Sequence, residues 1–346
     1  MKAKKYFRKT AKTSLVLVYL VIIAGAVVRM TGSGMGCPDW PKCFGYYIPP
    51  TEESQLQWQP EKEFKKGQAI IINDELQVAN KDFKTLSSYS SLNWEPYTKH
   101  EYAIFNPWHT WIEFINRLFG ALAGLATLVV AFLSIGYWKK NKKVTVLSWL
   151  VVVAMGFQAW LGATVVYSVL NPFKITIHMV MALVIVAMLL YLIAISNIKS
   201  RVFKYDRTTL ILFVTALVFT LIQVILGTQV REFVDAQVAL VGEDSKNLWL
   251  QDPTVQFYIH RSFSIVVTLL NLFIAFRIYK LGSGHSKINW VLLLILFEVI
   301  TGMAMYYMSF PFATQPIHLI LASLLFGVQF YLVLEVLKSK RSLKTL

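Results

Sequence analysis

Long apolar runs recur along the whole chain, separated by polar segments. Each run covers roughly the 20 residues that an α-helix needs to cross the hydrocarbon core of a bilayer. The first run lacks a small-residue cleavage site and is followed by further runs, so we expect a retained helix and not a signal peptide. The pattern predicts an all-α integral membrane protein with eight membrane-spanning helices, at residues 14–30, 109–136, 144–168, 174–196, 208–230, 256–279, 288–308 and 314–337.

One polar segment, residues 31–106, is far longer than the other connections. From about residue 51 onward it contains prolines, several aromatic residues and short apolar pieces such as 69–72. One interpretation of this segment is a small cap on the outer face. A polar composition is equally compatible with a mobile insertion. The sequence leaves both alternatives open and indicates no chemistry for this segment.

Basic residues outnumber acidic ones, 34 to 19, which gives a net charge of +15. Most of the acidic residues lie in the connections 31–106 and 231–255, and most of the basic residues lie in the alternate segments. The basic segments are 1–12, 139–143, 199–207, 277–287 and 338–344. Lys and Arg accumulate on the cytoplasmic side of membrane proteins, so we expect both termini in the cytoplasm and an even number of spans. The basic charge then faces anionic lipid, and nucleic acid is not an expected partner.

The two halves of the chain resemble each other. Gln158, Gly162 and His178 recur 140 residues later as Glu298, Gly302 and His318, without insertion. The run 115–119, Ile-Asn-Arg-Leu-Phe, matches 259–263, Ile-His-Arg-Ser-Phe, and Gly25 and Arg29 match Gly227 and Arg231. Both copies begin on the same side of the membrane, which makes this a parallel repeat. We expect two four-helix bundles, formed by residues 1–200 and 201–346.

Three histidines, His178, His260 and His318, lie within or just inside the outer ends of predicted spans. Burying an ionisable group in a bilayer without a partner costs several kcal/mol, so such residues are commonly functional. A lone histidine can simply hydrogen-bond between helices, but His178 and His318 occupy equivalent repeat positions. Imidazole is a common ligand for heme iron, so we predict that His260 and His318 bind one iron from both faces. His285, in a Gly-Ser connection, is expected to be solvated.

The first half departs from this arrangement because Asn116 stands where the second half has His260. Asparagine is a poor iron ligand, so the first site offers only His178 unless His109 reaches inward. His109 lies seven residues before Asn116, about 10 Å along a helix. Ligation from one side leaves the opposite face of an iron open for chemistry, whereas ligation from both sides suits electron transfer.

Glu113 and Arg117 share a helix face with Asn116. Glu113 is either a catalytic or proton-handling group or the ion-pair partner of Arg117. Glu298 is a second carboxylate inside a span, expected to pack or conduct protons. Four arginines near the outer ends of spans are candidate ligands for the propionates of heme, or alternatively contacts for lipid headgroups. They are Arg29, Arg117, Arg231 and Arg261.

The two cysteines, Cys37 and Cys43, both lie in the long outer segment. An even number of cysteines on the oxidising side of a membrane indicates a disulfide. Two free thiols or a metal site are the alternatives, although the spacing C-x5-C is not the usual one for zinc. We expect the disulfide.

Several of these residues resemble the motifs of one family, the heme A synthases. The stretch 29–43, Arg-Met-Thr-Gly-Ser-Gly-Met-Gly-Cys-Pro-Asp-Trp-Pro-Lys-Cys, resembles their first outer loop, and Glu113-Phe-Ile-Asn116-Arg117 resembles their E-x-x-H-R motif, with Asn116 in place of histidine. His178, His260 and His318 match the family's histidines in spans four, six and eight, so the resemblance covers nearly the whole chain. It implies oxidation of a ring methyl of heme O to a formyl group through successive hydroxylations, giving heme A for terminal oxidases.

The resemblance also implies a heme b on His260 and His318 and a substrate site for heme O near Glu113 and His178, with Glu113 and Asn116 as catalytic residues. The implied partners are a heme O synthase as donor, a membrane electron donor and possible further copies of the chain, in the inner membrane of a bacterial cell. The alternatives are a di-heme electron carrier of the quinol:cytochrome type, which would need two bis-histidine sites, and a transporter, which would need broken helices at mid-membrane.

Overall fold

The computed structural model describes residues 2–196 and 205–343. Within these ranges, eight helices are long and apolar enough to cross a membrane, which confirms the prediction of eight spans and makes this a multi-pass membrane protein. They are α1 (Lys2–Met30), α2 (Pro107–Ser134), α3 (Lys142–Tyr167), α4 (Pro172–Ser196), α5 (Arg207–Val241), α6 (Val255–Leu281), α7 (Ile288–Tyr307) and α8 (Thr314–Leu343). Most of the basic segment 199–207 lies outside the described residues.

Capping residues explain where several helices begin and end. The side chain of Asn106 accepts hydrogen bonds from the backbone of Trp108 and His109, and Pro107 occupies the first helical position of α2, where its missing N–H costs nothing. Asp206 caps α5 in the same way. Gly282, in the left-handed conformation, ends α6. Two helices are clearly longer than predicted: α1 begins at Lys2 instead of near residue 14, and α5 continues to Val241 instead of ending near residue 230.

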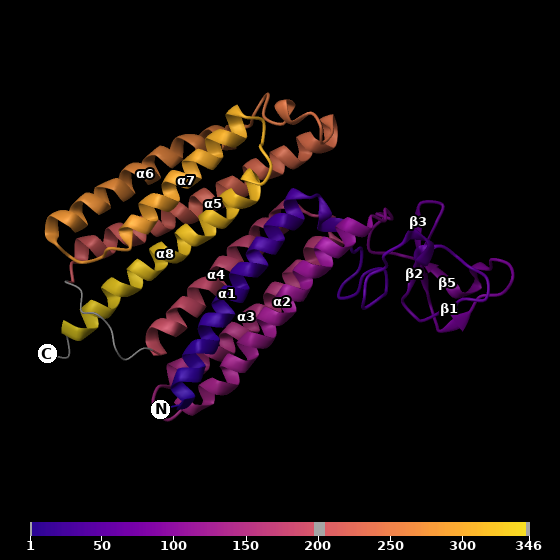
Figure 1. Cartoon of the computed structure of the whole chain (residues 1–346), viewed down its shortest axis with the longest axis horizontal. Coiled ribbons are helices and arrows are strands. Elements are labelled where there is room, and N and C mark those ends of the chain that lie inside the picture. The colour runs from indigo at the N-terminus through magenta and orange to yellow at the C-terminus, as the bar shows by residue number, and fades with distance from the viewer. Residues whose placement is uncertain (1, 197–204, 344–346) are drawn as a thin grey trace.

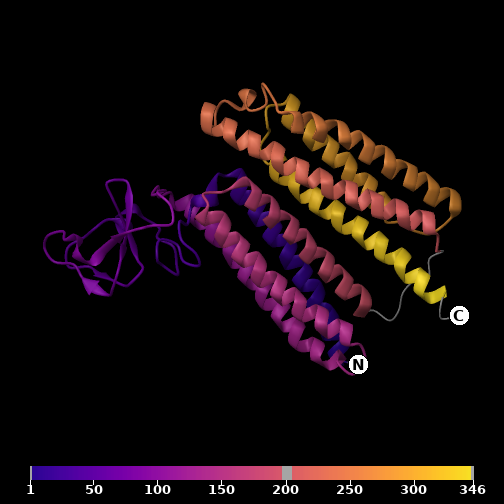
Figure 2. The ribbon, with the colours of Figure 1, turned by 180° about the vertical axis from the view of Figure 1, so that it is seen from behind.

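The helices form two groups, α1–α4 and α5–α8, which lie side by side (Figures 1 and 2). The groups meet where α1 and α4 contact α8 and where α4 contacts α5. Polar contacts also cross this boundary. The Tyr19 hydroxyl donates to the carbonyl of Ser323 at 3.4 Å, the hydroxyls of Thr176 and Thr228 lie 2.9 Å apart, and Arg29 on α1 pairs with Asp235 on α5 at 2.9 Å. Each group has its own apolar core, and a smaller buried cluster of Leu183, Val224 and Phe326 joins the two groups.

The long outer segment folds into a small cap beyond the first turn of α2 (Figure 1). Its elements are β1 (Glu63–Phe64), β2 (Ala69–Ile72), β3 (Glu75–Ala79), β4 (Phe83–Lys84) and β5 (Trp94–Pro96), with short 3-10 helices at Ser33–Met35, Glu53–Leu56 and Ser91–Asn93. All pairings are antiparallel, in the orders β1-β4 and β2-β3-β5. Phe64, Ile70, Ala79 and Trp94 form a core of their own. The structure therefore supports the folded cap.

His285 is buried, so the expectation that it is solvated was wrong. Two glycines with positive φ, Gly282 and Gly284, turn the connection between α6 and α7 back into the second group of helices. The imidazole meets the ring of Phe213 edge-on, and its Nδ1 lies 3.4 Å from a carboxylate oxygen of Glu335 on α8. A short polar connection can thus bury its histidine when a helix brings a carboxylate to it.

Candidate functional site

A cavity of about 1710 Å³ opens in the first group of helices. It exceeds the roughly 300–1,000 Å³ of ordinary small-molecule pockets, so it can take a large ligand. Its walls come from α1, α2, α3 and the start of α4, and Asn116 and His178 both line it. The outer end of α5 and the connection before α8 complete the wall, so the second half of the chain also contributes to this cavity.

Glycines create much of this space. Gly120 and Gly124 on α2 and Gly156 on α3 all line the cavity, and a methyl group added to any of them would meet no atom within 4 Å. Side chains at these positions would project into the opening and fill it. The arrangement leaves a slot between α2 and α3 that lies directly below Asn116 along α2.

His178 lies on α4 and faces α3. Gln158 donates a hydrogen bond from its amide to the His178 carbonyl at 3.0 Å, and the same amide lies 3.4 Å from the imidazole Nε2. Three buried polar atoms beside the cavity have no hydrogen-bond partner among the described residues: His178 Nδ1, Gln158 Oε1 and Asn116 Oδ1. Buried polar atoms in folded proteins are normally paired, so this group is suited to a polar or metal-containing ligand.

His109 takes no part in this cavity. It lies in the first turn of α2, where Asn106 caps its backbone N–H, and it is absent from the described residues that line the opening. Reaching the cavity would require the capped turn to unwind. Among the described histidines, His178 is therefore the one that the cavity offers to a ligand.

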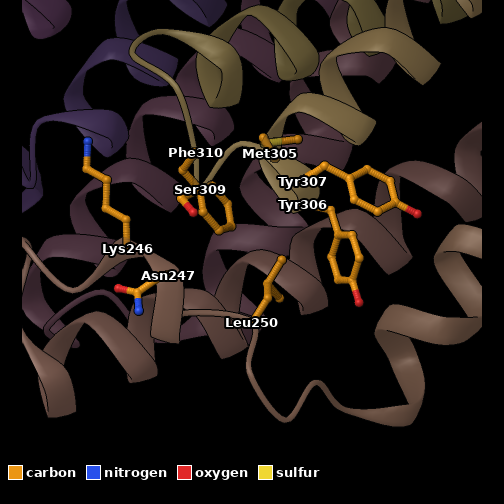
Figure 3. A pocket seen from close by; sticks show the side chains of 8 residues that line it. All are labelled: Lys246, Asn247, Leu250, Met305, Tyr306, Tyr307, Ser309 and Phe310. Carbon is orange, nitrogen blue, oxygen red and sulfur yellow. The ribbon is translucent and has the colours of Figure 1, made fainter.

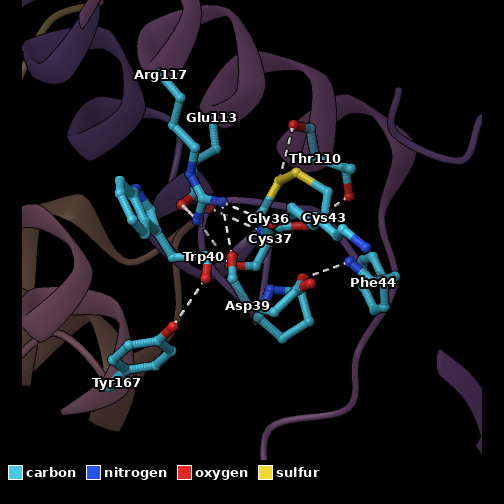
Figure 4. Close-up of polar contacts among 12 residues, drawn as sticks. Gly36, Cys37, Asp39, Trp40, Cys43, Phe44, Thr110, Glu113, Arg117 and Tyr167 are labelled. Carbon is cyan, nitrogen blue, oxygen red and sulfur yellow. Dashed lines mark hydrogen bonds and ion pairs between the residues drawn. A yellow bond between two sulfur atoms is a disulfide. The ribbon is translucent and has the colours of Figure 1, made fainter. Parts of the chain in front are cut away.

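The outer mouth of the cavity is built around an ion pair between Glu113 and Arg117 (Figure 4). Glu113 is buried; one carboxylate oxygen lies 2.5 Å from Arg117 and the other accepts the backbone N–H of Cys37 at 2.8 Å. Arg117 also donates to the carbonyls of Cys37, Asp39 and Lys42 at 2.7–3.0 Å. Arg117 thus holds the loop 37–43, and the ion pair foreseen as the alternative role for Glu113 is present.

Cys37 and Cys43 form the expected disulfide, which confirms that prediction. Both cysteines are buried against the start of α2. Thr110 donates to the Gly36 carbonyl at 2.7 Å, and a methyl group on Gly36 would lie 2.3 Å from the backbone oxygen of His109. Only glycine permits so close an approach of two backbones. The Gly-Cys pair therefore fixes the loop against the helix that carries Glu113.

Asp39 organises the inside of this loop. Its carboxylate accepts the backbone N–H groups of Phe44 and Gly45, and these bonds and the nearby Arg117 favour the charged form. Burial acts more strongly in the other direction and raises the pKa of the Asp39 carboxyl above its ordinary value. Trp40, the next residue, lines the cavity, and Tyr167 on α3 donates to its carbonyl at 3.0 Å. The loop thereby spans from α2 to α3 across the cavity mouth.

The remaining arginines divide into two environments. Arg29 and Arg231 line the cavity and share one partner, Asp235, at 2.9 and 2.6 Å. Arg261 lies instead about 6 Å from the centres of three aromatic rings in the second group, those of Phe257, Tyr258 and Tyr306. Of the four arginines, Arg29, Arg117 and Arg231 therefore meet at the cavity and Arg261 does not.

In the second group of helices, His260 and His318 face each other. Their ring centres lie 6.3 Å apart, with the rings inclined at 73°. Two imidazoles that share one metal, each with a metal–nitrogen bond of about 2 Å and its ring centre roughly 1 Å behind that nitrogen, have centres roughly 6 Å apart. The spacing therefore fits one metal held between the two rings.

Neighbouring side chains orient this pair. The Nδ1 of His318 lies 2.8 Å from a carboxylate oxygen of Glu298 and 2.9 Å from the Thr301 hydroxyl, which leaves its Nε2 for a ligand. Gln223 donates to the carbonyl of His260 at 3.0 Å. A carboxylate on the outer nitrogen of a metal-binding histidine fixes the ring and makes it a stronger ligand.

Four matching residues, one on each of α2, α4, α6 and α8, pack against a glycine on a neighbouring helix. They are Asn116, His178, His260 and His318. A methyl group added to the glycine would lie 3.9 Å from the facing side chain for Gly25 and Asn116, 3.4 Å for Gly162 and His178, 3.3 Å for Gly227 and His260, and 3.7 Å for Gly302 and His318. The two halves thus share one packing arrangement, in which a glycine leaves room for the neighbouring Asn or His side chain.

No group of three or more His, Cys, Asp or Glu side chains able to hold a bare metal ion occurs among the described residues. A histidine pair supplies only two ligands, which is what an iron already bound within a porphyrin accepts from a protein. The His260–His318 pair therefore fits the iron of a heme.

A second, smaller cavity of about 300 Å³ lies at the outer end of α7 (Figure 3). Its lining is Lys246, Asn247, Leu250, Met305, Tyr306, Tyr307, Ser309 and Phe310. Neither His260 nor His318 lines it, so it is separate from the candidate heme site.

The fold and the site define a class: a multi-pass membrane protein with paired intramembrane histidines and a large cavity beside one of them. The chain matches the COX15-CtaA model, cytochrome oxidase assembly protein, over residues 8–330, and therefore belongs to that family. It is similar to the heme A synthases of Rickettsia prowazekii and Flavobacterium johnsoniae, each 26% identical with 91% of this chain and 93% of the relative covered. The heme A synthase of Bacillus licheniformis is 23% identical, with 96% of both chains covered.

Asp235 and Trp40 are among the residues of the cavity wall that sequence reasoning missed. Asp235 was assigned to a loop, although its spacing of four from Arg231 would have placed both on one helix face if α5 had been extended. Trp40 belongs to the motif 29–43. No local pattern indicates that this side chain reaches a cavity between α2 and α3.

Proposed function

We propose that this protein is a heme A synthase, which oxidises a ring methyl of heme O to a formyl group by successive hydroxylations. One observation carries the proposal: in a chain of this family, the first half has a large open cavity with His178 and Asn116, and the second half has a closely facing histidine pair. The curated relatives named above are heme A synthases, which supports the same reaction here.

We infer that the chain is a duplicated four-helix unit, with residues 1–200 forming the substrate half and 201–346 the heme b half. The equal packing of glycines against Asn116, His178, His260 and His318 supports this duplication. The division is not complete, because the outer end of α5 forms part of the wall of the first-half cavity. The substrate site therefore depends on both units.

In the second half, His260 and His318 would hold the iron of heme b. When bound there, heme b supplies one-electron transfer. Glu298 accepts the Nδ1 proton of His318 and fixes the ring, and Gln223 fixes the backbone of His260. These residues keep both rings in place, so a change of charge on a ligand between them needs little rearrangement of the protein.

In the first half, His178 would ligate heme O from one side only. Asn116 offers an amide on the facing helix, which can hydrogen-bond a small oxygen ligand or water but does not close the site as histidine would. Glu113 lines the same cavity and is the negative group that can stabilise positive charge developing at the methyl carbon. Its bonds to Arg117 and to the Cys37 amide hold that charge in place.

Arg29 and Arg231 lie where the propionates of heme O would be bound, whereas Arg117 is occupied by the loop carbonyls. The loop 37–43 covers the mouth of the cavity, and the disulfide constrains this loop. Because Trp40 lines the cavity from this loop, access for a planar substrate depends on the loop position. The electron carrier alternative has no support in the first half, since Asn116 replaces the second histidine that it requires.

We also propose that both termini are cytoplasmic in the inner membrane of a bacterial cell. The start of α1 and the end of α8 lie at the same end of the helices, and the cap lies at the opposite end (Figure 1). A disulfide at that opposite end suits an oxidising compartment. Heme O would then come from a heme O synthase in the same membrane, electrons from a membrane donor, and copies of the chain could associate as homo-oligomers.

The test is co-expression with a heme O synthase in a host that makes no heme A, followed by heme extraction and mass analysis. We expect heme A in cells with the wild-type chain and heme O in cells with His178→Ala. Heme O and protoheme without heme A, from well-expressed wild-type protein, would refute the proposed reaction.

A further inference from the structure

Asp235 lies in the cavity wall between two arginines from different halves of the chain. One carboxylate oxygen is 2.9 Å from Nη2 of Arg29 on α1, and the other is 2.6 Å from Nη2 of Arg231 on α5. Nη2 of Arg231 also lies 3.4 Å from the backbone oxygen of Arg29. A single carboxylate therefore bridges two guanidinium groups at the outer end of the cavity.

The hydrogen bonds and charges around this bridge are incomplete. Two positive charges face one negative charge. Nε of Arg29 and both Nε and Nη1 of Arg231 are buried without a hydrogen-bond partner among the described residues. Buried charged donors are strongly stabilised by an anion that accepts them. The site can thus accept more negative charge than Asp235 provides.

The carboxylate is also the most exposed member of the bridge. The Asp235 side chain is 39% exposed, compared with 24% for Arg29 and 20% for Arg231. The arginines are therefore held by the surrounding helices, while the carboxylate is accessible from the cavity. Glu232, another acid of α5, also lines the cavity but pairs with neither arginine among the described contacts.

The position of Asp235 results from the extension of α5 beyond residue 230. As a helix, this segment places Asp235 one turn after Arg231 and directs both towards α1. A flexible loop would let the carboxylate follow the arginines, whereas a helix fixes where it can reach. A ligand with mobile carboxylates can therefore bond the guanidinium groups in ways that Asp235 cannot.

We propose that Asp235 takes the place of a carboxylate of the porphyrin substrate. It holds Arg29 and Arg231 in position when the cavity is empty, and it competes with the substrate's carboxylates for these two arginines. This rests on the proposed function, because it takes a porphyrin dicarboxylate as the ligand. Asp235 is then a positioning residue that orients both arginines and weakens substrate binding, which favours release of an equally anionic product.

Binding of two iron-free porphyrins tests this without histidine ligation or turnover. The probes are protoporphyrin IX, with two free carboxylates, and its dimethyl ester, with none, titrated by porphyrin fluorescence anisotropy into the full chain in detergent. We expect Asp235→Asn to bind the diacid roughly fivefold more tightly, the effect of removing one competing ion pair, and to bind the ester as the wild type does. Asp252→Asn, an exposed change on the connection between α5 and α6 and outside the cavity lining, should leave both affinities unchanged.

A second variant separates competition from general loosening of the helices. In Asp235→Asn combined with Arg231→Gln, the gain for the diacid should disappear. The proposal is overturned if Asp235→Asn weakens diacid binding, or if it shifts diacid and ester equally in protein that elutes like the wild type. If the folded wild type binds neither porphyrin, the proposed function fails and this inference fails with it. If the wild type binds both porphyrins and the variant does not discriminate, only this inference fails.

Discussion

In both halves of the molecule, polar side chains at matching positions pack against glycines, but the two resulting sites differ. In the second half, His260 and His318 face each other across 6.3 Å. In the first half, the corresponding Asn116 and His178 line a cavity of about 1710 Å³. Where the first half has Gly120, Gly124 and Gly156, the matching positions of the second half carry Ser264, Thr268 and Leu296. The first half thus has glycine at three cavity-lining positions where the second half has a side chain.

The hydrogen bonds that hold His318 and His178 also differ between the two halves. Glu298 holds the imidazole ring of His318 through Nδ1, whereas its repeat counterpart Gln158 donates to the backbone of His178 and leaves Nδ1 without a partner among the described residues. A ring anchored by a carboxylate suits a permanent ligand. A ring without that anchor suits a ligand that arrives and leaves, as a substrate does.

The largest expected effect concerns the histidine pair of the second half. His260→Ala or His318→Ala should abolish the six-coordinate low-spin heme of the purified protein, because each removes one of two facing ligands. Reduced-minus-oxidised spectra measure this. His178→Ala, the matched change in the other half, should retain the low-spin heme. A full low-spin complement in both of the first two variants would show that the facing rings do not hold heme.

The next effect tests the chemistry of the open site. Glu113→Gln keeps the shape and can still accept the Cys37 N–H, but it removes the charge beside the cavity. We expect heme A formation to fall by roughly 10²–10³-fold, as for other fixed electrostatic groups. Heme A yield per folded protein measures it, with alkylation confirming that the disulfide remains. Wild-type yield would leave Glu113 with only its structural role towards Arg117.

Asn116→His should convert the open site into a copy of the closed one. With heme O bound, the variant should show a low-spin signal by electron paramagnetic resonance, whereas the wild type should show a high-spin signal that is lost in His178→Ala. Heme A formation should fall roughly tenfold or more, equivalent to about 1.4 kcal/mol or more in the barrier. A low-spin signal in the wild type that disappears in His109→Ala would instead make His109 the second ligand.

The smallest expected effect tests the glycine packing. A methyl group on Gly227 would lie 3.3 Å from His260, tighter than ordinary contact, whereas one on Gly302 would lie 3.7 Å from His318, an ordinary distance. Gly227→Ala should therefore displace its histidine and broaden the low-spin signal, and Gly302→Ala should change it little. Equal spectra in the two variants would mean that the neighbouring helices absorb the added methyl groups.

Much of this protein could be predicted from its sequence because the bilayer imposes a strong local rule. Apolar runs of fixed length determined the eight spans, and the histidines inside them stood out because burying such groups is costly. The repeat at a constant offset paired His178 with His318 and exposed Asn116 as the departure. Two cysteines close together in one polar segment predicted the disulfide. These inferences need only spacing along one chain.

The tertiary structure alone decided which side chains meet between helices. Arg117 binds three loop carbonyls, Asp235 reaches Arg29 some 200 residues away in the chain, and His285 is buried against Glu335. Glycines of both α2 and α3 line the cavity. Such contacts depend on the rotation and length of packed helices, which hydrophobic periodicity barely constrains when every face of a helix is apolar. The sequence therefore determined the spans and the candidate ligands of iron. The packing of the helices decided that His260 and His318 lie close together and that His178 lines a large cavity.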